Sequence, residues 1–168
     1  MRALVTGAAS GIGRATCVQL ARDGNDKGGA MIAPVDIQAS AAMDELVEEL
    51  QSLGAKVHPG YFDMATVDGP GEAVAQSVAA FGGLDGVVSN AGINRPGALL
   101  DYSVDDWDAL FAVNTRASWL LAKAAHASLS ESGGAIVITA SMSGSNAHAG
   151  LGAYGPSKAA VIMLSKVL

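Results

Sequence analysis

The chain has 168 residues, of which 50% are hydrophobic and 5% aromatic, so we expect one domain with a core of aliphatic side chains. The net charge of −6, without a basic stripe, argues against nucleic acid as a partner. The single cysteine, Cys17, excludes an intrachain disulfide and fits a reducing compartment such as the cytoplasm, and neither a signal peptide nor a membrane span is predicted.

Apolar runs alternate with amphipathic segments along the whole chain. Strands are predicted at residues 2–6, 30–37, 56–61, 84–89 and 135–140, and helices at 11–23, 41–53, 67–81, 104–129 and 152–168. Ser40 is expected to cap the second helix and Gly54 to end it. The long fourth helix is expected to be two helices that meet near residues 111–114, and residues 24–29 to form a surface loop.

This alternation predicts an α/β protein with a parallel sheet and helices on both faces, in three α/β/α layers. The run Ala135-Ile136-Val137-Ile138 is therefore expected to be buried on both faces. Proline lacks an N–H group, so Pro34 weakens the second strand. Pro156 is tolerated only in a first helical turn, so the last helix should begin no earlier than about Gly152.

A glycine-rich turn joins the first strand to the first helix and reads Thr6-Gly7-Ala8-Ala9-Ser10-Gly11-Ile12-Gly13. Glycine allows a tight turn close to a ligand, and the helix N-terminus presents free N–H groups that suit a pyrophosphate. The spacing Gly-x-x-x-Gly-x-Gly differs from the common Gly-x-Gly-x-x-Gly, and an ordinary strand-to-helix turn is the alternative. The position of the turn favours a dinucleotide-binding site.

Asp36 ends the second predicted strand, 23 residues after Gly13. In such a sheet an acid at this point accepts hydrogen bonds from the adenosine ribose hydroxyls and repels a 2′-phosphate. Ser10 stands where a basic residue could have held that phosphate. NAD is therefore the favoured cofactor, with NADP as the alternative.

Tyr154 and Lys158 are four residues apart at the start of the last helix, so their side chains share one face. An ammonium beside a phenol favours the phenolate, which makes tyrosine a usable proton carrier for an alcohol or a carbonyl. Ser141 follows the fifth strand at the sheet edge where ligands bind, and its hydroxyl could hydrogen-bond a substrate oxygen. A solvated helix face and a loop serine are the structural alternatives.

Together these motifs resemble the short-chain dehydrogenase/reductase family of the common single-domain type. The resemblance covers residues 1–168 and rests on five signals in the family's order. These are the turn 6–13, Asn90-Ala91-Gly92, Asn114, Ser141 and the segment Tyr154-Gly155-Pro156-Ser157-Lys158. It implies a Rossmann-like doubly wound sheet in one NAD(P)-binding domain. It also implies an oxidoreductase that transfers a hydride between NAD(P) and a secondary alcohol or ketone.

The resemblance also implies a role for each motif. Tyr154 would exchange a proton with the substrate oxygen, Ser141 would orient that oxygen, and Lys158 would hold the nicotinamide ribose and make the phenol more acidic. Asn114 would hold a water in the proton relay. The expected cofactor contacts are Thr6, Gly7, Ser10, Gly11, Ile12, Gly13, Asp36, Asp63, Met64, Asn90, Ala91, Gly92, Tyr154 and Lys158, and no metal site is predicted.

Members of this family continue beyond the Tyr/Lys helix with two more strands, a substrate-covering loop and a Pro-Gly segment. The helical pattern still runs at Leu168, so we expect a domain incomplete at its C-terminus, with the fifth strand exposed and little activity on its own. Two alternative functions are a 3-oxoacyl-thioester reductase that uses NADPH and a non-catalytic nucleotide-binding fragment. The expected partners are a small alcohol or ketone and, by resemblance, further copies of the chain through helices 112–129 and 152 onward.

Overall fold

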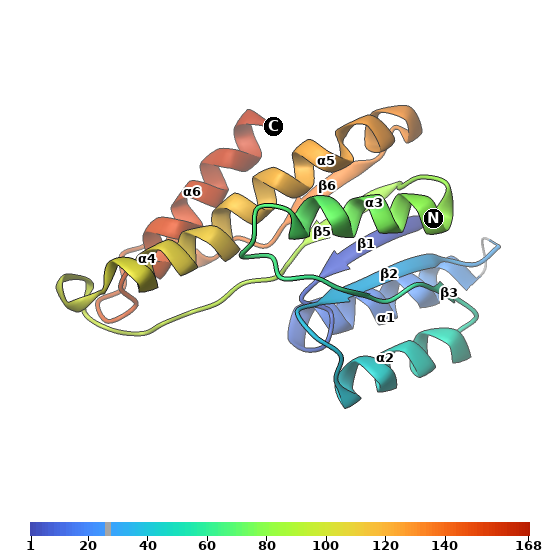
Figure 1. Cartoon of the computed structure of the whole chain (residues 1–168), viewed down its shortest axis with the longest axis horizontal. Helices are drawn as coiled ribbons and strands as arrows, with labels where there is room; N and C mark the ends of the chain where they lie inside the picture. Colours follow the sequence, from blue (N-terminus) through green and yellow to red (C-terminus); the bar gives the residue numbers. More distant parts are fainter. Residues whose placement is uncertain (26–27) are drawn as a thin grey trace.

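The computed structural model, which describes residues 1–25 and 28–168, contains one parallel sheet flanked by helices (Figure 1). Its six strands are β1 (Arg2–Thr6), β2 (Met31–Asp36), β3 (Lys56–Val57), β4 (Gly60–Tyr61), β5 (Gly86–Ser89) and β6 (Ala135–Ile138). Their order is β3-β2-β1-β5-β6, and β4 also pairs with β2. All pairs are parallel, with Thr6 opposite Val35 and Ser89 opposite Ile138, so the carboxyl ends of the strands meet at one edge. The predicted parallel α/β sheet is confirmed.

The helices follow the predicted order. They are α1 (Gly11–Asn25), α2 (Ala41–Ser52), α3 (Gly69–Phe81), α4 (Val104–Phe111), the π-helical turn η2 (Ala112–Arg116), α5 (Ala117–Ser132) and α6 (Tyr154–Val167). Two short 3₁₀ turns, η1 (Leu99–Asp101) and η3 (Met142–Gly144), lie in loops. None of the helices in the described ranges is long and apolar enough to cross a membrane.

The predicted helix boundaries are confirmed at several points. The Ser40 hydroxyl caps α2 and accepts a hydrogen bond from the amide of Met43 at 3.3 Å. The fourth helix divides at η2, where predicted, and α6 begins at Tyr154 with Pro156 in its first turn. The predicted loop at 24–29 is wrong at its start, because α1 continues to Asn25, and residues 26 and 27 lie outside the described residues.

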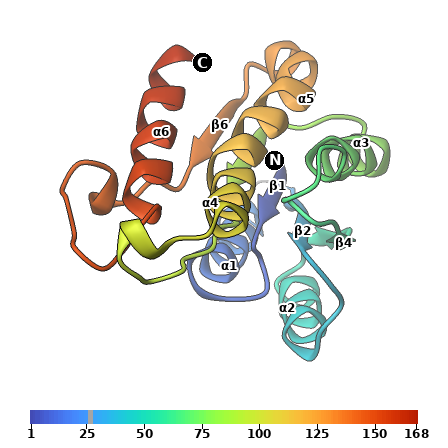
Figure 2. The same ribbon diagram turned by 60° about the vertical axis from the view of Figure 1, so that its left-hand side comes forward.

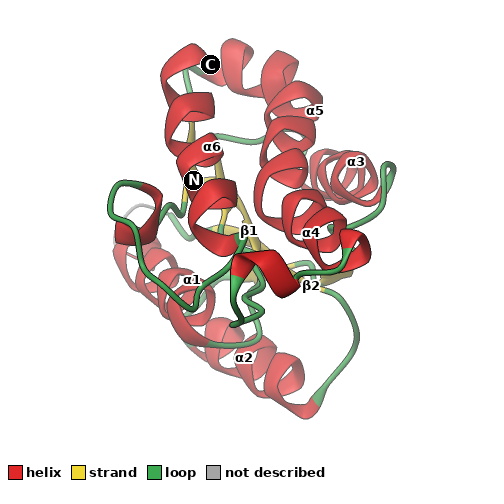
Figure 3. Cartoon of the chain, turned by 90° about the vertical axis from the view of Figure 1, so that its left-hand side faces the viewer, coloured by secondary structure: helices red, strands yellow, loops and turns green. Residues whose placement is uncertain are grey.

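Side chains alternate between the two faces of the sheet and form two separate cores. Leu4 packs in one core with α3 and α5, and Val5 packs in the other with α1 and α2. Figure 2 shows these helix pairs on opposite sides of the strands. Helix α6 packs against η2, on the same side as α5 (Figure 3), where the Thr115 hydroxyl donates to the carbonyl of Ser157 at 3.0 Å.

The predicted third strand at 56–61 is divided into β3 and β4. The carbonyls of Ile32 and Asp36 in β2 accept hydrogen bonds from the amides of His58 and Phe62, so every second residue of β2 faces this side. Alternation places Pro34 on the same side, where it has no N–H to donate. The pairing of β2 breaks there, between β3 and β4.

The predicted burial of β6 on both faces is wrong, because Val137 is 60% exposed. Strand β6 is the edge strand of the sheet, so the exposed fifth strand that the family resemblance implied is confirmed. Ile12, in the first turn of α1, is 64% exposed. The buried face of α1 is formed instead by Cys17, Val18 and Ala21.

Candidate active site

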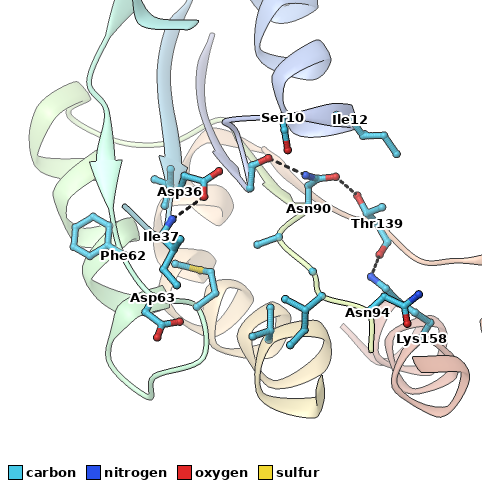
Figure 4. A pocket seen from close by; sticks show the side chains of 18 of the residues that line it. Ser10, Ile12, Asp36, Ile37, Phe62, Asp63, Asn90, Asn94, Thr139 and Lys158 are labelled. Atoms are coloured by element: carbon cyan, nitrogen blue, oxygen red, sulfur yellow. Dashed lines mark hydrogen bonds between the residues drawn. The ribbon is translucent and has the colours of Figure 1, made fainter. Parts of the chain in front are cut away.

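A pocket of about 590 Å³ lies at the carboxyl edge of the sheet, between the glycine-rich turn and the start of α6. Asp36, Phe62 and Asp63 lie at one end, and Asn94 and Lys158 lie at the other (Figure 4). This is the edge at which open α/β sheets bind ligands. Its lining residues are Gly7, Ser10, Gly11, Ile12, Val35, Asp36, Ile37, Phe62, Asp63, Met64, Asn90, Ala91, Gly92, Ile93, Asn94, Val113, Thr139, Tyr154 and Lys158.

The backbone of the glycine-rich turn has a conformation that allows a ligand to approach it closely. Gly7 and Gly11 have positive φ angles of 65° and 53°, which L-residues rarely adopt. A Cβ at Gly13 would collide with the carbonyl of Gly7, so only glycine fits at this position. Apart from its chain neighbours and the backbone of its own helix, no heavy atom lies within 4 Å of the Cβ position of Gly11, so the space beside this residue, which lines the pocket, is open. The first amides of α1 have no acceptor within the helix, and its first turn carries no acid.

Two backbone amides fix the carboxylate of Asp36 at the end of β2. Its two oxygens accept hydrogen bonds from the amides of Ala9 and Ile37, each at 2.8 Å. The bond to Ala9 links β2 to the glycine-rich turn. Asp36 therefore presents a fixed negative charge beside the turn, and Lys158 is the one cation among the pocket's described lining residues.

Asn90 ties the turn to the neighbouring strands. Its side-chain amide donates to the carbonyls of Thr6 at 3.1 Å and Gly7 at 3.3 Å. The hydroxyl of Thr6 accepts from the amides of Asn90 and Ala91, each at 3.0 Å. Thr6 is fully buried, so it supports the pocket wall from behind.

Tyr154 and Lys158 both line the pocket from the first turns of α6. The Lys158 ammonium lies 5.9 Å from the centroid of the Tyr154 ring and donates to the carbonyl of Thr139 at 2.7 Å. Burial lowers the pKa of Lys158 below its ordinary value of 10.5. This cation is thus held next to the phenol, as the spacing predicts.

Ser141 lies just outside the pocket. Its side chain caps η3 and accepts a hydrogen bond from the amide of Ser143 at 3.2 Å. A Cβ on Gly155 would lie 3.0 Å from the carbonyl of Ser143, so this turn packs against the start of α6, next to Tyr154. Since its oxygen only accepts here, the Ser141 hydroxyl retains its proton for another acceptor.

Asn114 is buried behind the pocket, inside the π-helical turn η2. Its side-chain oxygen accepts from the amide of Ile93 at 2.9 Å, and its nitrogen donates to the Ile93 carbonyl and the Ser157 hydroxyl, each at 3.0 Å. Both N–H groups are thus used within the protein. A water at this residue would have to rely on its main-chain carbonyl, not on the side-chain N–H groups.

The structure brings most of the predicted site residues into one pocket. Four are not in its lining: Thr6, Gly13 and Asn114 support it from behind, and Ser141 lies beside it. The sequence analysis missed Val35, Ile37, Phe62, Ile93, Asn94, Val113 and Thr139. Ile37, Phe62 and Thr139 each lie at or just after a strand end, which is the signal that could have identified them.

Comparisons with known proteins show which family the chain resembles. The sequence profile of the family described as short chain dehydrogenase matches residues 1–168. A short chain dehydrogenase/reductase of Aspergillus aculeatus is 38% identical over 87% of this chain and 52% of that protein. The 3-oxoacyl-[acyl-carrier-protein] reductase of Thermotoga maritima is 34% identical over 97% of this chain and 64% of that protein.

Solved structures show the same likeness. The chain superimposes with a TM-score of 0.91 on a short chain dehydrogenase from Burkholderia cenocepacia in complex with NADP, at 38% identity over 99% of this chain and 66% of that one. The chain thus spans about half to two thirds of the length of the proteins that it matches. The match of the whole chain to the family profile shows that it belongs to the short chain dehydrogenase family.

Proposed function

We propose that the chain is a nucleotide-binding domain, over residues 1–168, of an oxidoreductase that interconverts secondary alcohols and ketones. The observation that carries this proposal is the single pocket that has an open glycine turn and Asp36 at one end and Tyr154 with Lys158 at the other. A dinucleotide needs the first end and proton transfer needs the second.

The residues present fit a nicotinamide dinucleotide. The open position at Gly11 and the free amides of α1 suit the pyrophosphate, and Asp36 suits the adenosine ribose. Phe62, Asp63 and Met64 would surround the adenine, and Lys158 would hold the second ribose. A bound nicotinamide supplies the hydride donor or acceptor, and the protein positions it.

Residues of this chain would transfer the proton to and from the substrate oxygen. Tyr154 Oη receives the proton of the substrate hydroxyl during oxidation and returns one during reduction. The Lys158 ammonium stabilises the phenolate that forms, because a positive charge in a partly buried site favours the anion. The Ser141 hydroxyl donates a hydrogen bond to the substrate oxygen as negative charge develops on that oxygen. The substrate oxygen must therefore lie between Ser141 and Tyr154.

Replacing Tyr154 by Phe tests the catalytic assignment. Cofactor binding, measured by calorimetry with NAD⁺, should stay within about threefold of the parent, because only the hydroxyl is removed. Turnover of a panel of secondary alcohols, followed by nicotinamide absorbance, should fall by at least about a hundredfold. The matched control is Tyr61→Phe, an exposed tyrosine outside the pocket. Unchanged turnover in Tyr154→Phe would refute the assignment.

We propose NAD as the preferred cofactor because of the fixed carboxylate of Asp36. Asp36→Asn keeps an acceptor for the Ala9 amide but removes the charge that repels a 2′-phosphate. The ratio of NADP⁺ to NAD⁺ affinity should rise by at least about tenfold in this variant. Asp108→Asn, at an exposed residue of α4, should leave the ratio unchanged.

The second candidate is a 3-oxoacyl-thioester reductase that uses NADPH. It is favoured by the 34% identity to the acyl-carrier-protein reductase of Thermotoga maritima. Activity on a 3-oxoacyl thioester with NADPH but not with NADH would favour it and would contradict the reasoning from Asp36. Binding of NAD⁺ without turnover of any substrate would instead favour a non-catalytic nucleotide-binding role.

We also propose self-association through α5 and α6 and a cytoplasmic location. Trp119 on α5 and Met163 on α6 are 46% and 59% exposed and offer apolar contact surface. Val161, also on α6, is buried in the structure and does not belong to that surface. Sedimentation equilibrium of the parent and of Trp119→Ala tests the association.

A further inference from the structure

Thr139 follows β6 directly, and each of its polar groups binds a different part of the site. Its amide donates to the carbonyl of Ser89 at 3.0 Å, which extends the pairing of β6 with β5. Its carbonyl accepts from the Lys158 ammonium at 2.7 Å. Its hydroxyl donates to the side-chain oxygen of Asn90 at 3.2 Å. Thr139 also lines the pocket itself.

The orientation of the Asn90 side chain requires a donor at the position of the Thr139 hydroxyl. The Asn90 side-chain nitrogen faces two backbone carbonyls, those of Thr6 and Gly7. Because carbonyls only accept, the amide group of Asn90 cannot be turned around, and its oxygen must face Thr139. That oxygen needs a donor, and the threonine hydroxyl supplies one.

These contacts form one continuous path across the pocket (Figure 4). It runs from the carbonyls of the glycine-rich turn through Asn90 and Thr139 to the ammonium of Lys158. The path joins the proposed pyrophosphate end to the proposed proton-transfer end. Lys158 is 4% exposed, and a buried ammonium needs an acceptor, so the direction of the Thr139 carbonyl sets where the charge lies.

We propose that Thr139 is a positioning residue whose hydroxyl couples the glycine-rich turn to Lys158. The proposal rests on the proposed function of this pocket. An ammonium has three N–H groups, and the bond to Thr139 uses one of them. The other two are thereby left for the phenol and for the cofactor ribose. Tyr154 is the titratable group that faces Lys158 across this site.

A purely structural role makes a different prediction. If the hydroxyl only satisfied Asn90, its loss would lower stability without changing the properties of Lys158 or the affinity for the cofactor. Thr139→Val removes the hydroxyl at nearly constant volume, and Thr139→Ser restores it. Ser77→Ala is the control for a general loss of stability, because it removes a buried hydroxyl bond to Ala73 in α3, outside the pocket.

Two measurements on the apo protein and its NAD⁺ complex test the proposal without requiring turnover. We expect Thr139→Val to weaken NAD⁺ binding, measured by calorimetry, by about five- to tenfold, because a displaced Lys158 ammonium would lose about one hydrogen bond to the cofactor ribose. We also expect the NMR titration midpoint of the Lys158 side-chain carbon, assigned with Lys158→Met, to move in Thr139→Val. Thr139→Ser and Ser77→Ala should match the parent in both measurements.

The outcomes separate this proposal from the proposed function. If Thr139→Val binds NAD⁺ and titrates like the parent, Thr139 does not position Lys158 and the proposal fails. If Tyr154→Phe turns over substrate as fast as the parent, the proposed function fails while the affinity and titration results still decide the role of Thr139. Should Thr139→Val not fold, Thr139→Cys replaces it, because a thiol is only a weak donor.

Discussion

Lys158 combines a buried charge with a site that needs that charge. The ammonium is 4% exposed, and burial lowers its pKa below 10.5. A lowered pKa in the folded state means that the unfolded chain binds more protons between the folded pKa and 10.5. Stability from this group therefore rises with pH across that interval.

A Lys158→Met variant isolates this effect. The parent should gain stability relative to the variant as the pH rises from neutral toward 10, because only the parent loses a proton from a buried amine. Urea unfolding at several pH values in this range measures the difference. Lys166→Met, on an exposed residue in the last turn of α6, should show no such trend. A parent–variant difference that stays constant with pH would contradict the expectation.

Tyr102 places a buried polar atom, its hydroxyl oxygen, where the described part of the chain offers no hydrogen-bond partner. The Tyr102 ring packs so closely on Gly152 that a Cβ there would collide with it. Removing an unsatisfied polar group lowers the cost of burial, so Tyr102→Phe should stabilise the protein by about 1 kcal/mol. Thermal unfolding of this variant and of the exposed control Tyr61→Phe shows whether the change in stability is positive.

At the scale of elements, the π-helical turn η2 holds three segments together through Asn114. The side chain bonds both backbone groups of Ile93 and the hydroxyl of Ser157, which belong to the loop after β5 and to α6. Turns of this kind commonly occur at functional sites. The helix changes its winding here so that one buried amide can reach both neighbours.

Asn114→Ala should therefore cost much more than a surface substitution. It leaves the amide and the carbonyl of Ile93 without these partners, and we expect a loss of about 2–4 kcal/mol in the free energy of unfolding. Urea unfolding at neutral pH measures the loss, and Asn146→Ala, on an exposed loop, provides the matched control. Equal stability of the two variants would show that the Asn114 bonds contribute little.

The sequence predicted most elements because their signals are local. Ser40 as a cap, Pro156 in a first turn and alternating apolar runs act within a few residues. The break between β3 and β4 was missed because it depends on Pro34, a residue of the neighbouring strand. The apolar run of β6 alone predicted burial on both faces, and only the family resemblance implied an exposed strand, because no local pattern encodes the strand order that places β6 at the edge of the sheet.

The site shows the same division between local and tertiary signals. The glycine turn, Asp36 and the Tyr154–Lys158 pair are local motifs, and the structure brings them to one pocket. Thr139 was missed because its role depends on contacts with residues 19 and 49 positions away. Ser141 was predicted from the sequence to lie at the site, but the turn η3, which it caps, leaves its side chain outside the pocket lining.

For the molecule as a whole, cofactor binding should increase the free energy of unfolding. A cofactor that binds only the folded state at a hundred times its dissociation constant adds about 2.7 kcal/mol to the free energy of unfolding. For a chain of this size that corresponds to a rise of very roughly 5–10 °C in the unfolding midpoint. NAD⁺ should raise the midpoint more than NADP⁺ at equal concentration, and Asp36→Asn should narrow that gap. Equal shifts for the two cofactors in the parent would contradict the preference.

The pairing of β1 with β5 joins parts of the chain that are 83 residues apart, and an ion pair reinforces it. The carboxylate of Asp85 accepts from the backbone amide of Arg2 at 2.7 Å and from its guanidinium at 2.5 Å. The hydrogen bonds from Arg2 hold the pKa of Asp85 below its ordinary value of 3.8. A lowered carboxyl pKa stabilises the fold above the unfolded value, and this contribution disappears as the pH falls through the folded value.

Asp85→Asn should therefore lower the unfolding midpoint at neutral pH and have a smaller effect below about pH 4, where the parent carboxylate is also being neutralised. Both side chains are about one third exposed, so added salt should weaken the neutral-pH effect. Urea unfolding from acidic to neutral pH, with Asp108→Asn as the exposed control, measures both trends. A difference that persists unchanged into acid would assign the loss to the hydrogen-bonding pattern and not to the charge, because asparagine fills nearly the same volume but replaces one of the two oxygens that accept from Arg2 with an NH2 donor.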